Sequence, residues 1–215
     1  MDPSEGLRER KKQKTRRLIS ETARRLFAER GFEAVSVSEV AKEAEVSEAT
    51  VFNYFPTKED LVYEGMERFE EEMLQAVRER PAGESVVQAF GRFVLRVRGA
   101  LAAEDEESAK SLTKISRMIA ASPALRARER EILSRYADSL AALIGEETDA
   151  EKGDIRPGVV AQALIGLHAS LIAYVRPRLL EESPDLRRIA REVRVQGEKA
   201  LGLLEEGLGG YALRR

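Results

Sequence analysis

The 215-residue sequence predicts an all-α protein, with a small N-terminal three-helix unit followed by a larger helical bundle. Three observations predict this fold. Apolar residues recur at the i, i+3, i+4 spacing of amphipathic helices along most of the chain, and no segment alternates as a strand does. Two short segments within residues 36–55 carry helix-capping signals only a few residues apart. Glycine and proline lie between the periodic segments, where they end helices.

The composition is that of a soluble protein and narrows the possible chemistry. Charged residues make up 34% and hydrophobic residues 43% of the chain, with a net charge of −2. Cysteine is absent, which excludes disulfides and thiolate chemistry, and His168 is the single histidine. No apolar run approaches the roughly 20 residues that span a bilayer, and no signal peptide is visible. We expect a cytoplasmic protein without a membrane partner.

The first helix is expected from residue 7 or 8 to residue 30, with Gly31 as its C-terminal cap and Phe32 as the hydrophobic contact that follows. Its first part is strongly basic, which suits phosphate contacts but also fits a solvated tail. The basic residues are Arg8, Arg10, Lys11, Lys12, Lys14, Arg16 and Arg17.

Two short helices are predicted next, at residues 37–44 and 48–54. Ser36 caps the first and forms a capping box with Glu39, and Ser47 caps the second by accepting from the N–H of residue 49 or 50. Since only about three residues separate them, residues 36–55 form a helix-turn-helix. In that motif the second helix enters the major groove of DNA.

The segment LFAERGFEAVSVSEVAKEAEVSEATVFNYFPTKEDL resembles the DNA-binding domain of TetR-type transcriptional repressors (the TetR/AcrR family). The resemblance covers roughly residues 8–66, and its elements agree in order and distance. The most specific matches are Phe27, Gly31, Phe32, Val40, Ala41, Val46, Ser47 and the run from Thr50 to Lys58. The resemblance implies an N-terminal DNA-binding domain and a C-terminal domain for effector binding and dimerisation.

Three positions depart from the family pattern. Glu45 stands in the corner where the family usually has glycine, and a positive φ would be strained there. Either the corner has a slightly different shape or it stores some strain. Glu48 replaces a basic or neutral residue, and its carboxylate could accept from cytosine N4. Phe52 stands where the family often has tyrosine, which removes one possible phosphate-binding hydroxyl.

The start of the second helix of the motif projects into the groove, so we expect Glu48, Ala49, Thr50 and Asn53 at base edges or nearby phosphates. Tyr54 and Lys58 match family positions that hold phosphates, and Lys58 would begin a further helix, whose N-terminus favours anions. Ser36 and Ser38 are further phosphate candidates, with simple capping as the alternative. Val51, Phe52 and Phe55 are expected in the core.

Everything after the motif reads as helical. A fourth helix, capped by Thr57, is expected from residue 58 to about residue 80. Further helices are expected at 86–101, 112–119, 125–144, 159–180 and 184–208, with a loop at 145–158 and Gly145 ending the helix before it. We therefore divide the chain into a DNA-binding domain at 8–64 and an effector-binding and dimerisation domain at 65–215.

The helix at 159–180 is apolar nearly all round, so it must be covered on more than one side. It is either a central core helix or a helix that also contacts a partner subunit. The TetR resemblance implies pairing through the last two long helices, 159–180 and 184–208, and so a homodimer.

The resemblance also places an effector pocket in the bundle after Gly83. Lining candidates are Phe90, Phe93, Ile115, Met118, Tyr136, Leu164, His168 and Ile172, with Arg117 to meet an acidic head group. The alternative for each is an ordinary core position. The apolar composition hints at a hydrophobic small molecule.

These features predict a sequence-specific DNA-binding transcriptional regulator: a repressor released from a palindromic operator by a small hydrophobic ligand. A ligand-dependent activator, a helical interaction protein and a carboxylate-site enzyme are the alternatives. Because the sequence shows no glycine-rich phosphate loop and no Ser-His-Asp spacing, we expect no catalytic residue, cofactor or metal site.

Overall fold

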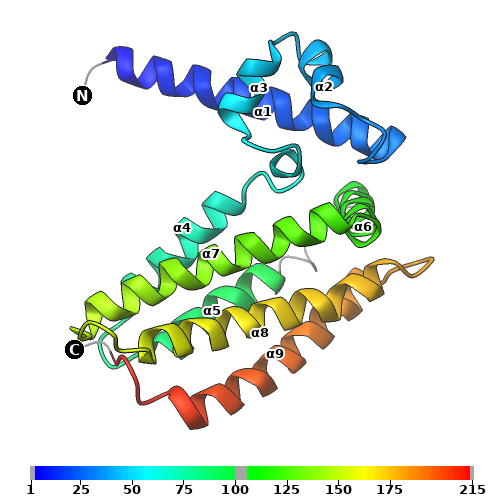
Figure 1. Ribbon diagram of the computed structural model, residues 1–215. Helices are drawn as coiled ribbons and strands as arrows, with labels where there is room; N and C mark the ends of the chain where they lie inside the picture. The colour runs from blue at the N-terminus through cyan, green and yellow to red at the C-terminus, as the bar shows by residue number, and fades with distance from the viewer. Residues whose placement is uncertain (1–2, 100–105, 214–215) are drawn as a thin grey trace. The chain divides into compact units, whose positions relative to one another are not determined.

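The computed structural model describes residues 3–99 and 106–213, and its regular elements are helices (Figure 1). No strand is assigned in these residues, although an isolated antiparallel bridge joins Ser85 and Leu213. The chain divides into two compact units. Unit 1 comprises Met1–Gly65 and Arg117–Arg128, and unit 2 comprises Met66–Ser116 and Glu129–Arg215. The all-α prediction is confirmed.

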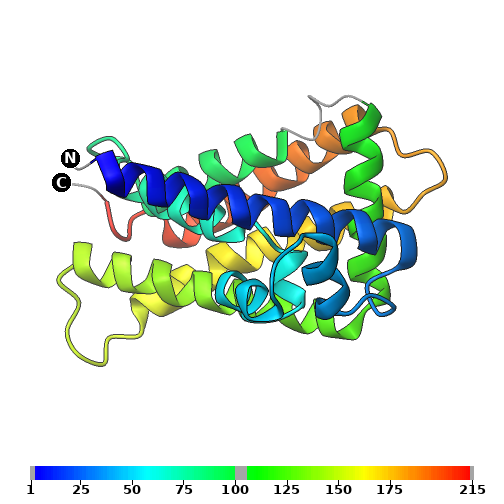
Figure 2. The same cartoon turned by 90° about the horizontal axis from the view of Figure 1, so that it is seen from above.

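Unit 1 is built around the first helix, and Figure 2 shows the two short helices against it. The helix begins earlier than expected, at Pro3, because proline is well accommodated in a first turn. Apolar side chains from every element form its core, including Ile19, Phe27, Val40, Val51, Phe55 and Leu61. The elements are α1 (Pro3–Arg30), α2 (Val37–Glu43), α3 (Glu48–Tyr54) and the 3₁₀ turn η1 (Glu59–Leu61).

The expected helix from residue 58 to residue 80 is wrong, because the chain forms η1 and then a separate helix, α4 (Met66–Arg78). Thr57 and Asp60 make the expected capping bonds: the Thr57 N–H donates to the carboxylate, and Thr57 Oγ1 accepts from the Asp60 N–H. Only the 3₁₀ turn η1 follows these bonds, with Lys58 as its N-cap residue and no side-chain capping bond. Gly65 then has a φ of 90°, which a right-handed helix cannot contain.

Unit 1 also includes a segment distant in sequence, the end of α6 (Glu106–Ala121) and the start of α7 (Pro123–Glu147). Hydrogen bonds of side chains join this segment to the rest of unit 1. Ser122 Oγ donates to Glu33 (2.7 Å), the Tyr63 hydroxyl donates to the Leu125 carbonyl (2.9 Å), and Arg128 Nε donates to Asp60 (2.8 Å). The sequence analysis assigned residues 117–128 to the second domain, whereas the structure clusters them with the first.

Unit 2 contains α4, most of α6 and of α7, and three further helices. α5 packs on α9 at two glycines, since a Cβ at Gly91 or Gly197 would lie within 3 Å of a leucine side chain. Glycine therefore allows the close approach of these helices, while α8 and α9 lie side by side (Figure 1). The helices are α5 (Val86–Gly99), α8 (Arg156–Leu179) and α9 (Leu186–Leu208), and the expected end of α5 at residue 101 lies outside the described residues.

Several further bounds differ from expectation. α6 begins at Glu106 instead of residue 112, and α7 and α8 begin two and three residues earlier than expected, at Pro123 and Arg156. α7 continues through Gly145 to Glu147, so Gly145 does not end the helix and the loop before α8 is shorter than expected. Glycine lowers helix propensity by only about 1 kcal/mol, which the packing of a 25-residue helix overrides. α9 begins after Asp185, whose carboxylate accepts from the Arg188 N–H.

The expectation that no segment is long and apolar enough to span a bilayer is wrong for α8. An 18-residue window in this helix has a mean hydropathy of 1.7, so by length and composition it could cross a bilayer. In that window 44% of the residues are buried inside the protein. A core helix of a soluble protein passes the same test, so the hydropathy of α8 is only weak support for a membrane span.

Candidate functional site

The helix-turn-helix of unit 1 is formed by two capped helices. The Ser36 hydroxyl accepts from the Glu39 N–H (3.2 Å), while the Glu39 carboxylate accepts from the Ser36 N–H (2.8 Å). The Ser47 hydroxyl accepts from the Thr50 N–H (3.0 Å). These bonds confirm the predicted caps and satisfy backbone donors that a helix start leaves unpaired.

Glu39 is held in place by more than its capping bonds. Arg30 at the end of α1 lies 2.7 Å from its carboxylate. The bond from the Ser36 N–H and the bond from Arg30 lower the pKa of Glu39 to about 2. The start of α2 is therefore attached to α1 by an ionised carboxylate at neutral pH.

The corner between α2 and α3 has the strained geometry, which was one of the two alternatives for its sequence. Glu45 has a φ of 54°, in the left-handed region where a Cβ is disfavoured by roughly 1–2 kcal/mol. The Val46 N–H donates to the Ala41 carbonyl (2.9 Å), which closes the corner. Glu45 therefore adopts the left-handed backbone conformation that glycine usually adopts in such a turn.

The exposed face of α3 consists of Glu48, Ala49, Phe52 and Asn53. The expectation that Phe52 belongs to the core is wrong, because 46% of it is exposed. Residues four apart share a helix face, so Phe52 lies with Glu48, whereas the buried Val51 faces the opposite side. The hydrophobicity of Phe52 does not predict its exposure, but its position four residues after Glu48 on the same helix does.

Thr50 and Tyr54 are half-buried at the edges of that face. The Thr50 hydroxyl lies 2.8 Å from the Ser47 hydroxyl, so it is already engaged in the cap of α3. Ser36 and Ser38 are exposed at the start of α2. The structure therefore brings the predicted DNA-contact residues of α3 to one surface and its edges.

Lys58 differs from its expected setting. Its ammonium lies 4.2 Å from the centre of the Phe32 ring and 5.9 Å from that of Phe27. The helix it was expected to begin is only the three-residue η1, so a helix N-terminus does not strengthen anion binding there. Any phosphate contact by Lys58 must come from its own charge.

The basic part of α1 exposes Arg10, Lys11, Lys12 and Lys14. Arg16 lies over the Phe55 ring, with the guanidinium carbon 5.1 Å from the ring centre. Arg17 forms an ion pair with Glu21 (2.7 Å), and the side chain of Arg8 lies outside the described residues. The exposed lysines form a cationic surface suited to phosphate contacts.

Four rings from four helices of unit 2 meet in one cluster. Phe69 of α4 lies at the centre, 5.2 Å from Phe93, 5.5 Å from Tyr136 and 4.8 Å from His168 between ring centroids. His168 is 1% exposed. The sequence analysis named three of these residues but missed Phe69, whose place on the apolar face of α4 was the available signal.

The other expected pocket residues are more dispersed. Phe90 and Leu164 are buried in the core, and Ile115 and Ile172 are half-buried. Arg117 and Met118 belong to unit 1 instead. In the described residues, no group of three or more histidine or acidic side chains could hold a metal ion.

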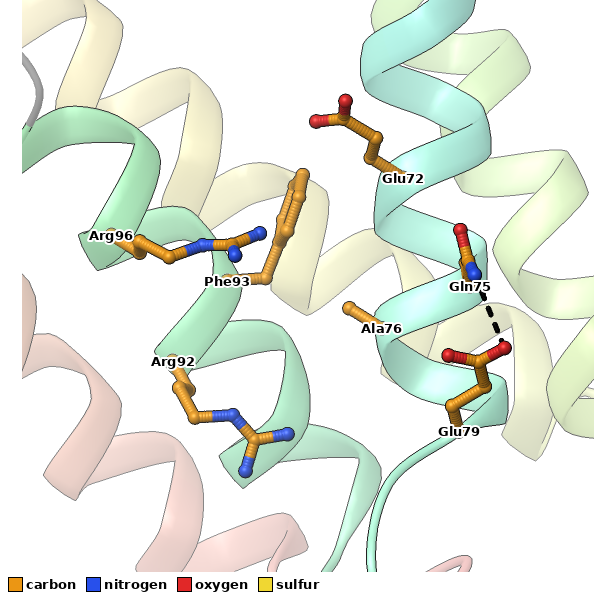
Figure 3. A pocket seen from close by; sticks show the side chains of 7 residues that line it. All are labelled: Glu72, Gln75, Ala76, Glu79, Arg92, Phe93 and Arg96. Atoms are coloured by element: carbon orange, nitrogen blue, oxygen red, sulfur yellow. Dashed lines mark hydrogen bonds between the residues drawn. The ribbon is translucent and has the colours of Figure 1, made fainter.

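Unit 2 has an open pocket of about 410 Å³ between α4 and α5 (Figure 3). Of the residues expected from the sequence, only Phe93 lines it. Its lining residues are Glu72, Gln75, Ala76, Glu79, Arg92, Phe93 and Arg96.

Residues 19–64 match the model of a family described as bacterial regulatory proteins, tetR family. The chain is 31% identical over 158 residues to the HTH-type transcriptional regulator TcmR of Streptomyces glaucescens, which covers 71% of this chain and 69% of TcmR. Two solved structures share the fold. One is NalD of Pseudomonas aeruginosa, with a TM-score of 0.54 and 19% identity over 87% of this chain and 97% of NalD. The other is FadR of Bacillus halodurans, with a TM-score of 0.52 and 23% identity over 90% of this chain and 96% of FadR.

Proposed function

Since this chain belongs to the TetR family of bacterial regulatory proteins and is a DNA-binding regulator of transcription, we propose that it acts as a homodimeric repressor. A small ligand would release it from a palindromic operator. The observation that supports this proposal best is the α2–turn–α3 unit, whose caps position an outward row of side chains on α3. Such a row is what a recognition helix offers to the major groove.

Within that row, each side chain has a chemical partner on DNA. Asn53 can bond bidentately to adenine, and Glu48 can accept from cytosine N4. Ala49 and the exposed Phe52 can contact thymine methyl groups, and Thr50 can bond several bases. We assign phosphate contacts to Ser36, Ser38, Tyr54, Lys58 and the exposed lysines of α1, because phosphate contacts orient a protein on the duplex.

The homodimer would form through α8 and α9. On α8 the exposed residues Gly166, Ser170 and Ala173 are small, so another helix can approach closely. On α9 Val195 and Leu203 are 47% and 71% exposed, unusual for large apolar side chains unless a partner covers them. Two copies related by a two-fold axis would bury both surfaces and place two reading heads on a palindrome.

Release by a ligand requires that the ligand bind one state of the protein better than the other. We place the ligand in unit 2, at the open pocket between α4 and α5, where Phe93 joins the pocket wall to the ring cluster around Phe69. The apolar rings favour a ligand with an apolar body. We also place the protein in the cytoplasm, where its DNA is, and propose no membrane partner.

A ligand-dependent activator is the second candidate, because the same contacts serve either direction of control. The two differ in whether the ligand weakens or strengthens DNA binding. A catalytic role finds no support among the relatives, which are transcription regulators.

The proposal is tested by selecting binding sites from a random duplex library, repeated with Tyr54→Ala, Lys58→Ala and the control Arg194→Ala on exposed α9. Enrichment of a palindrome by the wild type and the control, and its loss in folded Tyr54 and Lys58 variants, is the expected result. Absence of any enriched sequence at low salt contradicts the repressor proposal, and enrichment that persists in both variants contradicts the assigned phosphate contacts.

A further inference from the structure

The pocket between α4 and α5 has two chemically different walls (Figure 3). α5 contributes Arg92 and Arg96, one turn apart, and the Phe93 ring, which lies beside the Arg96 guanidinium. α4 contributes Ala76 together with two carboxylates and Gln75. The pocket volume of about 410 Å³ is in the range of small-molecule sites, which is roughly 300–1,000 Å³.

Two of the four charges at this pocket have counter-ions. Glu72 pairs with Arg68 (2.8 Å) and Arg92 pairs with Glu84, whereas Glu79 accepts from the neutral amide of Gln75 (3.1 Å) and keeps its negative charge on the α4 wall.

Arg96 is different. Its guanidinium lies 5.8 Å from the centre of the Phe93 ring, and no carboxylate of a described residue lies within ion-pair distance of it. A cation at a pocket, beside an aromatic ring and without a counter-ion, suits an anionic ligand group. Arginine forms bidentate, charge-assisted bonds to carboxylates and phosphates, and these are stronger than neutral hydrogen bonds.

We propose that this pocket binds an amphipathic organic anion, with Arg96 as its counter-ion and Phe93 and Ala76 in contact with its flat apolar body. Arg92, one turn away, can share the anionic group. This inference rests on the proposed function in one respect, because the anion would be the effector of the regulator.

Contacts within unit 2 lead from the pocket to the start of α4. The Phe93 ring contacts Phe69, which stacks on Tyr136. The Tyr136 hydroxyl donates to the carbonyl of Met66 (2.6 Å), the first residue of α4. A ligand that moves Phe93 therefore acts on the helix that directly follows the unit 1 segment ending at Gly65.

The test uses the full-length protein without DNA and two probes with the same aromatic body. One is 1-anilinonaphthalene-8-sulfonate, an anion, and the other is N-phenyl-1-naphthylamine, which is neutral. Fluorescence titrations compare the wild type with Arg96→Gln, with Ala76→Leu, and with the control Arg194→Gln, an exposed arginine of the same unit. Thermal melts confirm that each variant is folded.

We expect Arg96→Gln to weaken binding of the anionic probe about tenfold, the equivalent of roughly 1.4 kcal/mol, and to leave the neutral probe unchanged. Ala76→Leu fills the pocket and should weaken both probes, while Arg194→Gln should change neither. Equal affinity of wild type, Arg96→Gln and Ala76→Leu for the anionic probe overturns the proposal, since the probe would then bind elsewhere.

A second measurement separates this inference from the proposed function. The anionic probe should change the operator affinity of the wild type and not that of Arg96→Gln. If the wild type binds the operator but the Arg96→Gln substitution does not change binding of the anionic probe, the proposed regulator stands and the proposed pocket is overturned. If probe binding depends on Arg96 but does not change operator affinity, the effector role of the pocket is overturned. If the protein binds no operator, the proposed regulator is overturned, and the fluorescence titrations still test the pocket.

Discussion

The guanidinium of Arg80 lies 2.6 Å from the carboxylate of Glu147, and only 1% of the Arg80 side chain is exposed. The same guanidinium donates to the carbonyls of Val77 (2.6 Å), Glu84 (3.1 Å) and Ala212 (3.0 Å). One buried side chain therefore joins the residues after α4, the end of α7 and the segment that follows α9. A buried charge of this kind is stable only while its partners are present.

We predict that Arg80→Met lowers the free energy of unfolding by about 3–5 kcal/mol, because it leaves Glu147 unpaired and removes donors from three carbonyls. Urea unfolding followed by circular dichroism measures the change. Arg194→Met, which breaks the exposed pair with Glu198, is the control and should change the free energy by less than about 0.5 kcal/mol. Similar small losses in both variants would show that the Arg80 contacts are not stabilising.

The capping box of α2 should make stability depend on pH. The pKa of Glu39 is about 2 in the folded protein and 4.5 is its ordinary value, so folding favours the ionised form. Its contribution is therefore complete above pH 4.5 and is lost as the pH falls toward 2. Melting temperatures of wild type and Glu39→Gln should differ at pH 7 and converge through this window. A difference that is constant with pH would rule out the ionised carboxylate as the cause.

The close packing of α5 on α9 predicts opposite effects of alanine at two glycines of α9. A Cβ at Gly197 would lie 2.4 Å from Leu95 Cδ2, whereas nothing lies within 4 Å of one at Gly207. Gly197→Ala should destabilise the protein by about 1 kcal/mol, since overpacking outweighs the gain in helix propensity. Gly207→Ala should stabilise it by up to about 1 kcal/mol. Chemical denaturation measures both, and a stabilised Gly197→Ala would mean that Leu95 moves aside without cost.

Substitutions in unit 1 should separate base recognition from phosphate binding. Asn53→Ala should cost about 1–3 kcal/mol at one base pair and relax specificity there, with an unchanged salt dependence. Lys14→Ala should weaken binding to all sequences and reduce the slope of log K against log salt by about 0.9. Fluorescence anisotropy with labelled duplexes at several salt concentrations measures both. Loss of specificity with Lys14→Ala would reverse these assignments.

The proposed α8–α9 interface should be sensitive to charge. Leu203→Asp and Val195→Asp place a carboxylate on an apolar contact, where an unpaired charge is costly, so dimer dissociation constants should rise roughly a hundredfold or more. Ile155→Asp, in the loop before α8 and 74% exposed, is the control. Analytical ultracentrifugation at micromolar concentration measures the change. Dimers that persist in both interface variants would place the interface on another surface.

The elements that sequence analysis predicted correctly depend on neighbouring residues. The caps at Ser36 and Ser47 each involve bonds within a few positions. The sequence left the shape of the corner at Glu45 open, and the structure shows a left-handed conformation there. The errors arose where composition was used without phase or context. Phe52 is apolar but shares the helix face of Glu48, and the bonds between Thr57 and Asp60 precede no α-helix, only a 3₁₀ turn.

The sequence by itself determined the helical fold, the helix-turn-helix and the membership of unit 1 in its family, because capping and periodicity act over a few residues. Only the tertiary structure decided that Phe69 gathers three rings, that Arg80 binds Glu147, and that Arg96 faces a pocket without a counter-ion. Those relationships join helices far apart along the chain. They depend on how each helix is rotated and packed against the next, which no local pattern encodes.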